Sequence, residues 1–535
     1  MDAGRTEGAS DFSLRQLESA PNGMGRKLPA AAAVLILLWL MAGPDSYPLL
    51  VPHESRHAGI VHEMWAARQY LVPRIDGLPV LDGAPLYYWL ALGFVSLLGA
   101  DEWVLRLPSA VSAVVLLVVL AKVLQPWPSS RFLSVLFALF LVQPALILTG
   151  RYAAPEMLSI LFLAWAAGSF FQASVMAEAG EKPDRWILSA WIGSGLLGLS
   201  AGTLAAFVPS IITLVWLALR RRLDLIGALC WWPAMVLGAV LVLPWLILAS
   251  ARHPGIVPVM LERQVLGLFG HGRHGWEECA LHLRAQVMFL GSLPLLMCLY
   301  RYTDPVRRAA LSTPQAGFMA VWLAVVVLLH PLVTMTLLGP AIAAVVPLLY
   351  FGALALAPSG ESHERGSLWG WILHLVTVAV VWWAGEHLVS ARVSPVEPVV
   401  STIGHYYRSA TDKVVMLDRY DYEFNYYLRS PKLIYVATDW ESADQPGQPA
   451  WKEEILASAR FARNTAESML LEYDDFLTRI CGRRVVNLWV IGRPNAAERH
   501  PVLNDMTEVT STDSVYAWYL EAGEPLVSEA CSSVH

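Results

Sequence analysis

Long apolar runs recur through the first three-quarters of the chain, and polar stretches separate them. A continuous apolar run of about twenty residues is typical of a helix that crosses a lipid bilayer. We therefore predict an α-helical polytopic membrane protein with about eleven or more transmembrane helices. They are expected near residues 28–46, 106–124, 132–149, 157–176, 186–202, 204–219, 225–249, 284–300, 313–329, 332–352 and 368–389.

The charges in the connecting loops predict the orientation. One set of loops is short and basic, and it includes Arg220, Arg221 and Arg222. The positive-inside rule places these loops and the N-terminus in the cytoplasm. We therefore predict a multi-pass protein of the plasma (inner) membrane. An odd number of spans then puts the C-terminus outside. The predicted domains are a disordered cytoplasmic N-terminus (1–27), a transmembrane domain (28–392) and an extracytoplasmic α/β domain (393–535).

Two of the predicted outward loops, 47–105 and 250–283, are long and polar. The first contains the apolar stretch 86–100, which is short for a span and lacks a basic flank. We predict an interfacial helix there, because counting it as a span would turn the basic loops outward. The second is rich in His, Arg and Gly. The outward face is therefore expected to carry the polar chemistry.

The C-terminal region has a different pattern from the rest of the chain. Residues 413–439 predict a strand, a short helix and a second strand, and 483–493 predict a further strand. Short β runs that alternate with helical pieces favour a small α/β domain. Cys481 and Cys531 lie in this region, and a pairing between them is open if it faces an oxidising compartment.

Composition excludes several classes of protein. The net charge of −6 and the absence of a Lys/Arg-rich tract argue against a nucleic-acid partner. The chain contains no G-x-G-x-x-G and no P-loop, so a nucleotide site has no support in the sequence. None of the five cysteines forms a C-x-x-C pair, which argues against a cysteine-based metal site.

The string HESRH at 53–57 matches the zinc-peptidase motif H-E-x-x-H. Two histidines four residues apart share one helix face, as such a motif requires. However, the string lies outside the apolar runs, it has no clear third ligand, and Arg56 places a cation between the two histidines. A membrane zinc metallopeptidase is therefore kept only as the weakest alternative, and no metal ligand is assigned.

The same stretch carries a second and longer pattern. It includes Glu54, Arg56, Val72-Pro73, Pro85-Leu86, Tyr88-Trp89, Asp101-Glu102, Arg106-Leu107-Pro108-Ser109 and the segment GRYAAPEM at 150–157. Over about 50–160 the chain resembles the GT-C membrane glycosyltransferases, in the branch of lipid A aminoarabinose transferase and protein O-mannosyltransferase. The family's catalytic carboxylate aligns with His53, and its loop lysine aligns with Gly83 or Ala84.

The resemblance implies a GT-C-like helical bundle that moves a sugar from a polyprenyl-phosphate donor to a lipid, glycan or protein acceptor at the outer face. The headgroup must lie at the interface because the prenyl chain dissolves in the bilayer. No cofactor is required by this interpretation, and an assisting divalent cation is left open. The replaced carboxylate and lysine motivate the alternative of a catalytically silent homologue that binds lipid-linked glycans.

Candidate site residues fall into two groups. Guanidinium groups clamp phosphates, and an acid can organise the loop around them, which selects Arg56, Arg151, Arg263 and Asp82. A carboxylate or a neutral imidazole can accept the proton of an acceptor hydroxyl, which selects Glu54, His53 and Glu156 as catalytic candidates.

Overall fold

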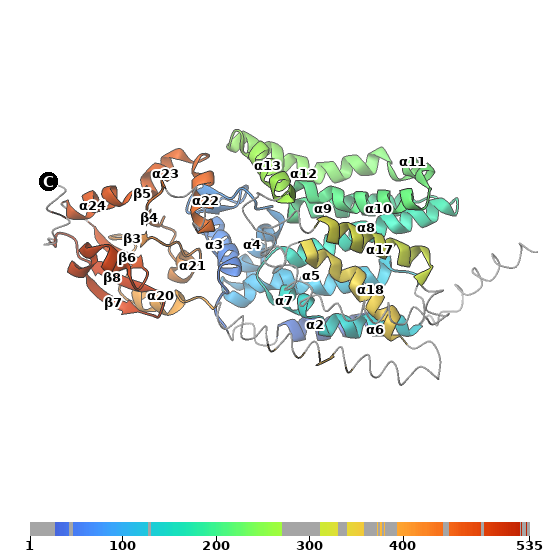
Figure 1. Ribbon diagram of the computed structural model, residues 1–535, viewed down its shortest axis with the longest axis horizontal. Coiled ribbons are helices and arrows are strands. Elements are labelled where there is room, and N and C mark those ends of the chain that lie inside the picture. Colours follow the sequence, from blue (N-terminus) through green and yellow to red (C-terminus); the bar gives the residue numbers. More distant parts are fainter. Residues whose placement is uncertain are drawn as a thin grey trace, which may run out of the picture.

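The computed structural model describes residues 27–41, 47–126, 130–269, 311–329, 340–357, 393–441, 449–482 and 486–524, together with a few single positions. Figure 1 shows two parts, a bundle of helices and, at one end of it, a tail that contains a sheet. The tail in the described range begins at residue 393, and the first loop (residues 47–105) lies between the tail and the bundle.

Apolar helices form the bundle, with α8 at its centre between α5, α9 and α10. Aromatic side chains, among them Trp216, Phe318 and Trp322, are buried between these helices. The elements are α2 (Lys27–Leu40), α5 (Glu102–Val123), α6 (Ser130–Val142), α7 (Pro144–Arg151), α8 (Glu156–Glu178), α9 (Asp184–Ala201), η1 (Thr203–Phe207), α10 (Val208–Leu219), η2 (Leu223–Leu225), α11 (Ile226–Leu229), α12 (Trp232–Arg252), α13 (Ile256–Phe269), α17 (Pro314–Leu329), η5 (Pro340–Ala344) and α18 (Val345–Leu356).

Three described helices, α5, α8 and α12, are long and apolar enough to cross a membrane. The pair α6 and α7 makes a fourth candidate if it is counted as one broken span, with a bend of 59°. The predicted spans 284–300 and 368–389 lie outside the described residues, apart from single positions in the second. The total of eleven therefore stays a prediction.

The structure differs from the predicted boundaries at several places. The span expected at 132–149 breaks at Pro144, because proline has no N–H for the helix ladder and its ring clashes with the preceding turn. The span expected at 225–249 begins only at Trp232, where a proline again occupies the first turn. The expected outward loop 250–283 contains helix α13 up to Phe269, and its remainder lies outside the described residues.

The first loop folds into two helices and a hairpin. They are α3 (His53–Ala66), β1 (Arg74–Ile75), β2 (Leu78–Pro79) and α4 (Leu86–Leu98). Asp76 and Gly77 form the two-residue turn, with φ angles of 47° and 78°. An Asp-Gly pair suits this turn because both central residues need positive φ. The predicted interfacial stretch 86–100 is helical as α4.

The tail is built on a six-stranded mixed sheet in the order β5-β4-β3-β6-β8-β7. The first four of these strands are parallel, whereas β8 runs antiparallel to β6 and to β7. The strands are β3 (Asp412–Leu417), β4 (Tyr435–Ala437), β5 (Leu470–Leu471), β6 (Asn487–Gly492), β7 (Thr507–Ser511) and β8 (Tyr516–Leu520).

Short helices connect and cover these strands. They are α20 (Glu397–Gly404), α21 (Phe424–Leu428), α22 (Ala450–Ala459), α23 (Arg463–Met469), α24 (Tyr473–Cys481), α25 (Ala496–Arg499) and η7 (Pro501–Asp505). The strand, helix and strand predicted within 413–439 are present as β3, α21 and β4.

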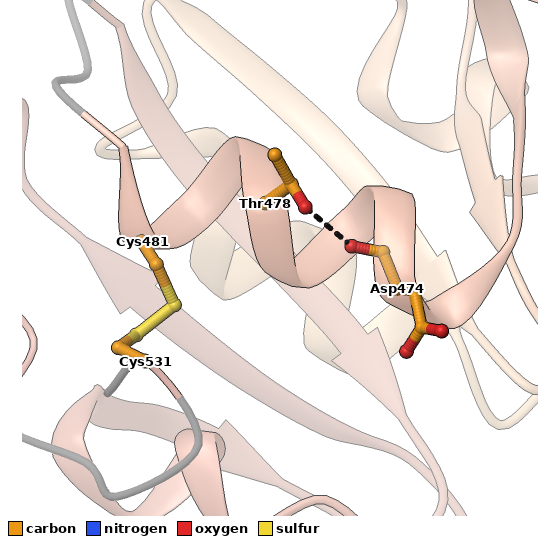
Figure 2. The surroundings of a disulfide bond; sticks show 4 residues. All are labelled: Asp474, Thr478, Cys481 and Cys531. Carbon is orange, nitrogen blue, oxygen red and sulfur yellow. Dashed lines mark hydrogen bonds between the residues drawn. A yellow bond between two sulfur atoms is a disulfide. The ribbon is translucent and has the colours of Figure 1, made fainter. Parts of the chain in front are cut away.

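A disulfide joins the end of α24 to the C-terminal residues of the chain. Cys481 is bonded to Cys531, which is the pairing that the sequence left open. Figure 2 shows this bond beside α24, where the Thr478 hydroxyl donates to the Asp474 carbonyl over 2.9 Å. The bond fastens a terminal residue to the helix that covers the sheet.

The hairpin of the first loop anchors the tail. The carboxylate of Asp76 accepts hydrogen bonds from the Tyr420 hydroxyl, from Asn425 Nδ2 at 3.0 Å and from the Ile434 amide at 3.3 Å. On α3, Gly59 lies so close to Tyr422 that an added Cβ would be 2.2 Å from the Tyr422 carbonyl oxygen. The first loop and the tail are therefore packed tightly against each other.

Candidate functional site

Helix α3 presents candidate residues on two opposite faces. Side chains two positions apart point about 200° apart around a helix, so Glu54 and Arg56 point away from each other. Glu54 faces the bundle and is fully buried, whereas the side chain of Arg56 is 16% exposed and faces the tail. The two faces of α3 therefore meet different parts of the molecule.

Glu54 is the centre of a buried network. Its Oε1 accepts from Arg106 Nε at 2.7 Å and from the Ala153 amide at 3.0 Å. Its Oε2 accepts from Arg106 Nη2 at 2.9 Å and from the Leu50 amide at 3.0 Å. With four donors and no exposed surface, this carboxylate has no free path to an acceptor hydroxyl. The geometry favours a structural role for Glu54 over the general-base role expected from the sequence.

The contact with Ala153 brings the segment 150–157 directly against the first loop, as the sequence pattern suggested. Glu156 begins α8 there, and it interacts electrostatically with Tyr87 and Tyr88 of α4. Arg151 instead contacts α2, where it donates to the Trp39 carbonyl over 3.0 Å and lies over the indole ring. Glu156 is thus near the first loop, whereas these contacts of Arg151 lie on the α2 side of the bundle.

Arg56 is held between two carboxylates. Its Nε and Nη2 donate to Glu454 Oε1 over 2.9 and 2.6 Å, and Nη2 also donates to Asp82 Oδ1 over 2.6 Å. The second oxygen of Glu454 accepts from the Tyr422 hydroxyl at 2.7 Å. We name Arg56, Asp82, Glu454 and Tyr422 the arginine junction.

Sequence reasoning missed Glu454 and Tyr422. Glu454 follows Arg56 by 398 positions and belongs to α22 of the tail. Nothing in the local sequence around it, AWKEEILASA, distinguishes it from an ordinary charged helix position. Only the docking of the tail on the first loop brings it to Arg56.

The histidines of HESRH lie one turn apart on α3. His57 is buried, and its Nδ1 is 2.9 Å from the Tyr88 hydroxyl. Burial, followed by the positive charge of Arg56, lowers the pKa of His57 to about 3, so this ring stays neutral near pH 7. Among the described residues no group of three or more His, Cys, Asp or Glu side chains is arranged to hold a metal ion. The zinc-peptidase alternative therefore gains no third ligand from this part of the chain.

An apolar pocket opens beside Asp82, on the side of the arginine junction that faces α12 and α13. Arg263 of α13 acts electrostatically on Asp82, so a second guanidinium lies near this pocket. The other lining residues are mainly apolar and include Ala84, Trp245, Leu246, Val257, Met260 and Leu261. The arrangement brings two guanidinium groups and an apolar surface of α12 and α13 to the two sides of Asp82.

Comparisons with known proteins find similarity in sequence and in fold. Residues 82–248 match the family described as dolichyl-phosphate-mannose-protein mannosyltransferase. An undecaprenyl phosphate-alpha-4-amino-4-deoxy-L-arabinose arabinosyl transferase from Edwardsiella ictaluri is 29% identical over 228 residues, which is 41% of this chain and 40% of that protein. The protein of the same name from Aeromonas hydrophila is 24% identical over 271 residues, or 49% of each chain. The matched region thus spans half or less of these relatives.

Solved structures extend the likeness over most of the chain. The structure of ArnT from Cupriavidus metallidurans bound to undecaprenyl phosphate superposes with a TM-score of 0.72 at 16% identity, covering 92% of this chain and 97% of that chain. The oligosaccharyltransferase AglB from Archaeoglobus fulgidus gives a TM-score of 0.52 at 12% identity, with 88% and 70% covered. At these identities the likeness concerns the fold.

The fold and the family match define the class: the chain is a polytopic helical membrane protein with the architecture of the GT-C membrane glycosyltransferases. Within that class, the curated relatives and the ArnT structure show where the likeness is most specific. The chain is similar to the ArnT-like branch.

Proposed function

We propose that this protein moves a sugar from a polyprenyl-phosphate donor to a lipid, glycan or protein acceptor at the outer face of the membrane. The observation that carries the proposal is Arg56 at the tail-side end of the bundle, with apolar residues of α12 and α13 on the other side of its partner Asp82. A prenylated phosphate needs a guanidinium for the headgroup and an apolar surface for the chain. The similar ArnT structure is bound to undecaprenyl phosphate, which supports this donor class.

In this proposal Arg56 is the principal phosphate contact and Arg263 is the second. The acceptor hydroxyl attacks the anomeric carbon, the bond from that carbon to the phosphate oxygen breaks, and the phosphate leaves with the electron pair. Arg56 and Arg263 stabilise the charge that accumulates on the departing phosphate. Asp82 orients Arg56 through the contact at 2.6 Å.

A base must accept the proton of the acceptor hydroxyl. Glu54 is occupied by four donors, and His57 by Tyr88. His53 is half-buried at the start of α3, one turn before the junction, and it stands where the family has its carboxylate. We assign the base role to His53, with Glu156 as the second candidate. Replacing His53 with Ala should abolish transfer, whereas His53→Asp, which restores a carboxylate, should keep it.

The direct test uses the purified protein in membranes with radiolabelled polyprenyl-phosphate sugars. Transfer by the wild type, lost in Arg56→Ala and retained in Glu453→Gln on an exposed position of α22, would support the proposal. Binding of the donor without transfer of any sugar would instead support a catalytically silent homologue. That alternative is motivated by the histidine at position 53, where the family has a carboxylate. Absence of both binding and transfer for every donor would reject both interpretations.

The orientation is part of the proposal. With eleven spans and a cytoplasmic N-terminus, the tail lies outside, and the disulfide between Cys481 and Cys531 agrees with an oxidising compartment. A membrane-impermeant maleimide should label these two cysteines in intact cells only after mild reduction. Labelling that requires permeabilised cells would place the tail in the cytoplasm and contradict the proposed topology.

A further inference from the structure

The Nε and Nη2 atoms of Arg56 already donate to carboxylates in this structure. Two nitrogens of the guanidinium donate to Glu454 Oε1, and one of them also donates to Asp82. Arginine binds a phosphate through these same in-plane N–H groups. Moreover, both partners of these nitrogens are carboxylates, so an incoming phosphate has to compete with two anions for the same edge of the guanidinium.

We propose that Glu454 is an internal competitor for the donor phosphate and thereby sets the affinity of the site for its donor. The inference rests on the proposed function, because it assumes that Arg56 receives the phosphate. When the phosphate binds, Glu454 must leave the guanidinium. The tail therefore contributes a residue that determines binding at a site otherwise built from the first loop and the bundle.

Glu454 is a better competitor than Asp82. The Asp82 side chain is 59% exposed and reaches one nitrogen, whereas Glu454 is 20% exposed and reaches two. A carboxylate less accessible to water is screened less, so its hold on Arg56 is stronger. The Tyr422 hydroxyl also fixes the second oxygen of Glu454, and Tyr422 in turn packs against Gly59 of α3.

Glu454 lies at the boundary between the hairpin and α22. A second pocket lies between the hairpin and α22, and Glu454 forms part of its wall. Its other lining residues are Ile75, Leu78, Val80, Tyr420, Tyr422, Ile455, Ser458 and Met469. A carboxylate released from Arg56 still has the Tyr422 hydroxyl as a donor, while α22 remains against β2. Exchange of one anion for another then needs no separation of the tail from the first loop.

The experiment measures binding of undecaprenyl phosphate to the full-length protein in nanodiscs. Glu454→Gln keeps the size of the side chain and removes its charge, so we expect binding about tenfold tighter or more, the scale of a lost charge-assisted hydrogen bond. Tyr422→Phe loosens Glu454 and should tighten binding by a smaller factor. Glu453→Gln, the neighbouring exposed acid, should leave the affinity unchanged.

A merely structural Glu454 predicts the opposite sign, because loss of a structural contact does not improve binding. Equal or weaker binding by Glu454→Gln, with measurable binding by the wild type, would overturn the inference and leave the proposed function intact. Equal tightening by Glu453→Gln would also overturn it, since bulk charge would then be the cause. No binding by any variant would reject the proposed function itself. Combining Arg56→Ala with Glu454→Gln should remove the gain, because the two residues act through one contact.

Discussion

The two faces of α3 use the same chemical groups for different purposes. On one face Glu54 and Arg106 form a bidentate pair with neither side chain exposed to solvent. On the other face Arg56 meets Asp82 and Glu454 where water has partial access. The pairs have similar distances, so geometry alone does not separate them. The two pairs differ in how deeply they are buried and in how many additional donors each carboxylate has.

The difference follows from the cost of desolvation. A buried carboxylate is tolerated only when its charge and lone pairs are satisfied, and Glu54 meets this condition with Arg106 and two backbone amides. Such a pair cannot exchange partners without leaving a charge uncompensated. The arginine junction, at the edge of a pocket, can exchange a carboxylate for another anion. An ion pair that must exchange its partner during function is therefore expected on the Arg56 face of α3.

The largest expected effect comes from breaking the buried pair. Glu54→Ala removes the carboxylate that compensates the buried charge of Arg106, which should lower the free energy of unfolding by about 3–5 kcal/mol. Thermal unfolding in detergent, followed by tryptophan fluorescence, measures this loss. Replacing both residues with leucine should recover part of the stability, because no buried charge remains. A single variant as stable as the wild type would contradict the structural role assigned to Glu54.

The second effect concerns the opposite face. Arg56→Ala should weaken donor binding by about 10- to 100-fold, since hydrogen bonds to charged groups contribute about 1.5–3 kcal/mol. Its unfolding temperature should fall much less than that of Glu54→Ala. Titration with undecaprenyl phosphate alongside thermal unfolding separates the two readouts. If Arg56→Ala unfolds as readily as Glu54→Ala, the distinction between the two faces is lost.

A third prediction extends the comparison along α3 to Glu63, which accepts from the Gly77 amide of the hairpin at 2.7 Å. Burial, followed by the charge of Asp76, raises the pKa of Glu63 to about 8, and burial raises that of Asp76 to about 6. The folded state therefore holds protons that the unfolded state has released, and stability should fall as pH rises from about 5 through 8.

Unfolding temperatures recorded between pH 5.5 and 9 measure this dependence. Glu63→Gln cannot ionise, so its curve should be flatter than that of the wild type over the same range. Asp76→Asn should flatten the lower part of the range, where its own carboxyl titrates. A wild-type protein that becomes more stable toward pH 9 would contradict the sign of the effect.

The smallest effect is expected for an exposed ion pair. Asp101 and Arg429 are 3.9 Å apart, and their side chains are 54% and 83% exposed. Asp101→Asn should change the free energy of unfolding by no more than about 0.5–1 kcal/mol. It serves as the matched control for Glu54→Ala, because it removes one carboxylate facing one arginine. A loss as large as that of Glu54→Ala would show that burial is not what distinguishes the pairs.

Some features of this protein could be predicted because they depend on neighbouring residues. Apolar run length predicted helices such as α5 and α8, and the succession of short β runs and a helical piece within 413–439 predicted β3, α21 and β4. The predicted helix boundaries were wrong where a proline interrupted an apolar run, as at Pro144. The length of an apolar run contains no information about the missing N–H of a proline. The family pattern drew attention to Glu54 and Arg56, but it could not tell which face of α3 each would occupy relative to the bundle.

Hydrophobic length and short motifs are local properties, so they were enough to predict a membrane-embedded helical bundle that resembles the GT-C class. The enclosure of Glu54 by Arg106 and the contact of Glu454 with Arg56, 398 positions away, became visible only in the folded protein. Desolvation and ion pairing depend on which surfaces pack together. Packing of the tail on the first loop brings together side chains whose contact could not be predicted from their local sequences.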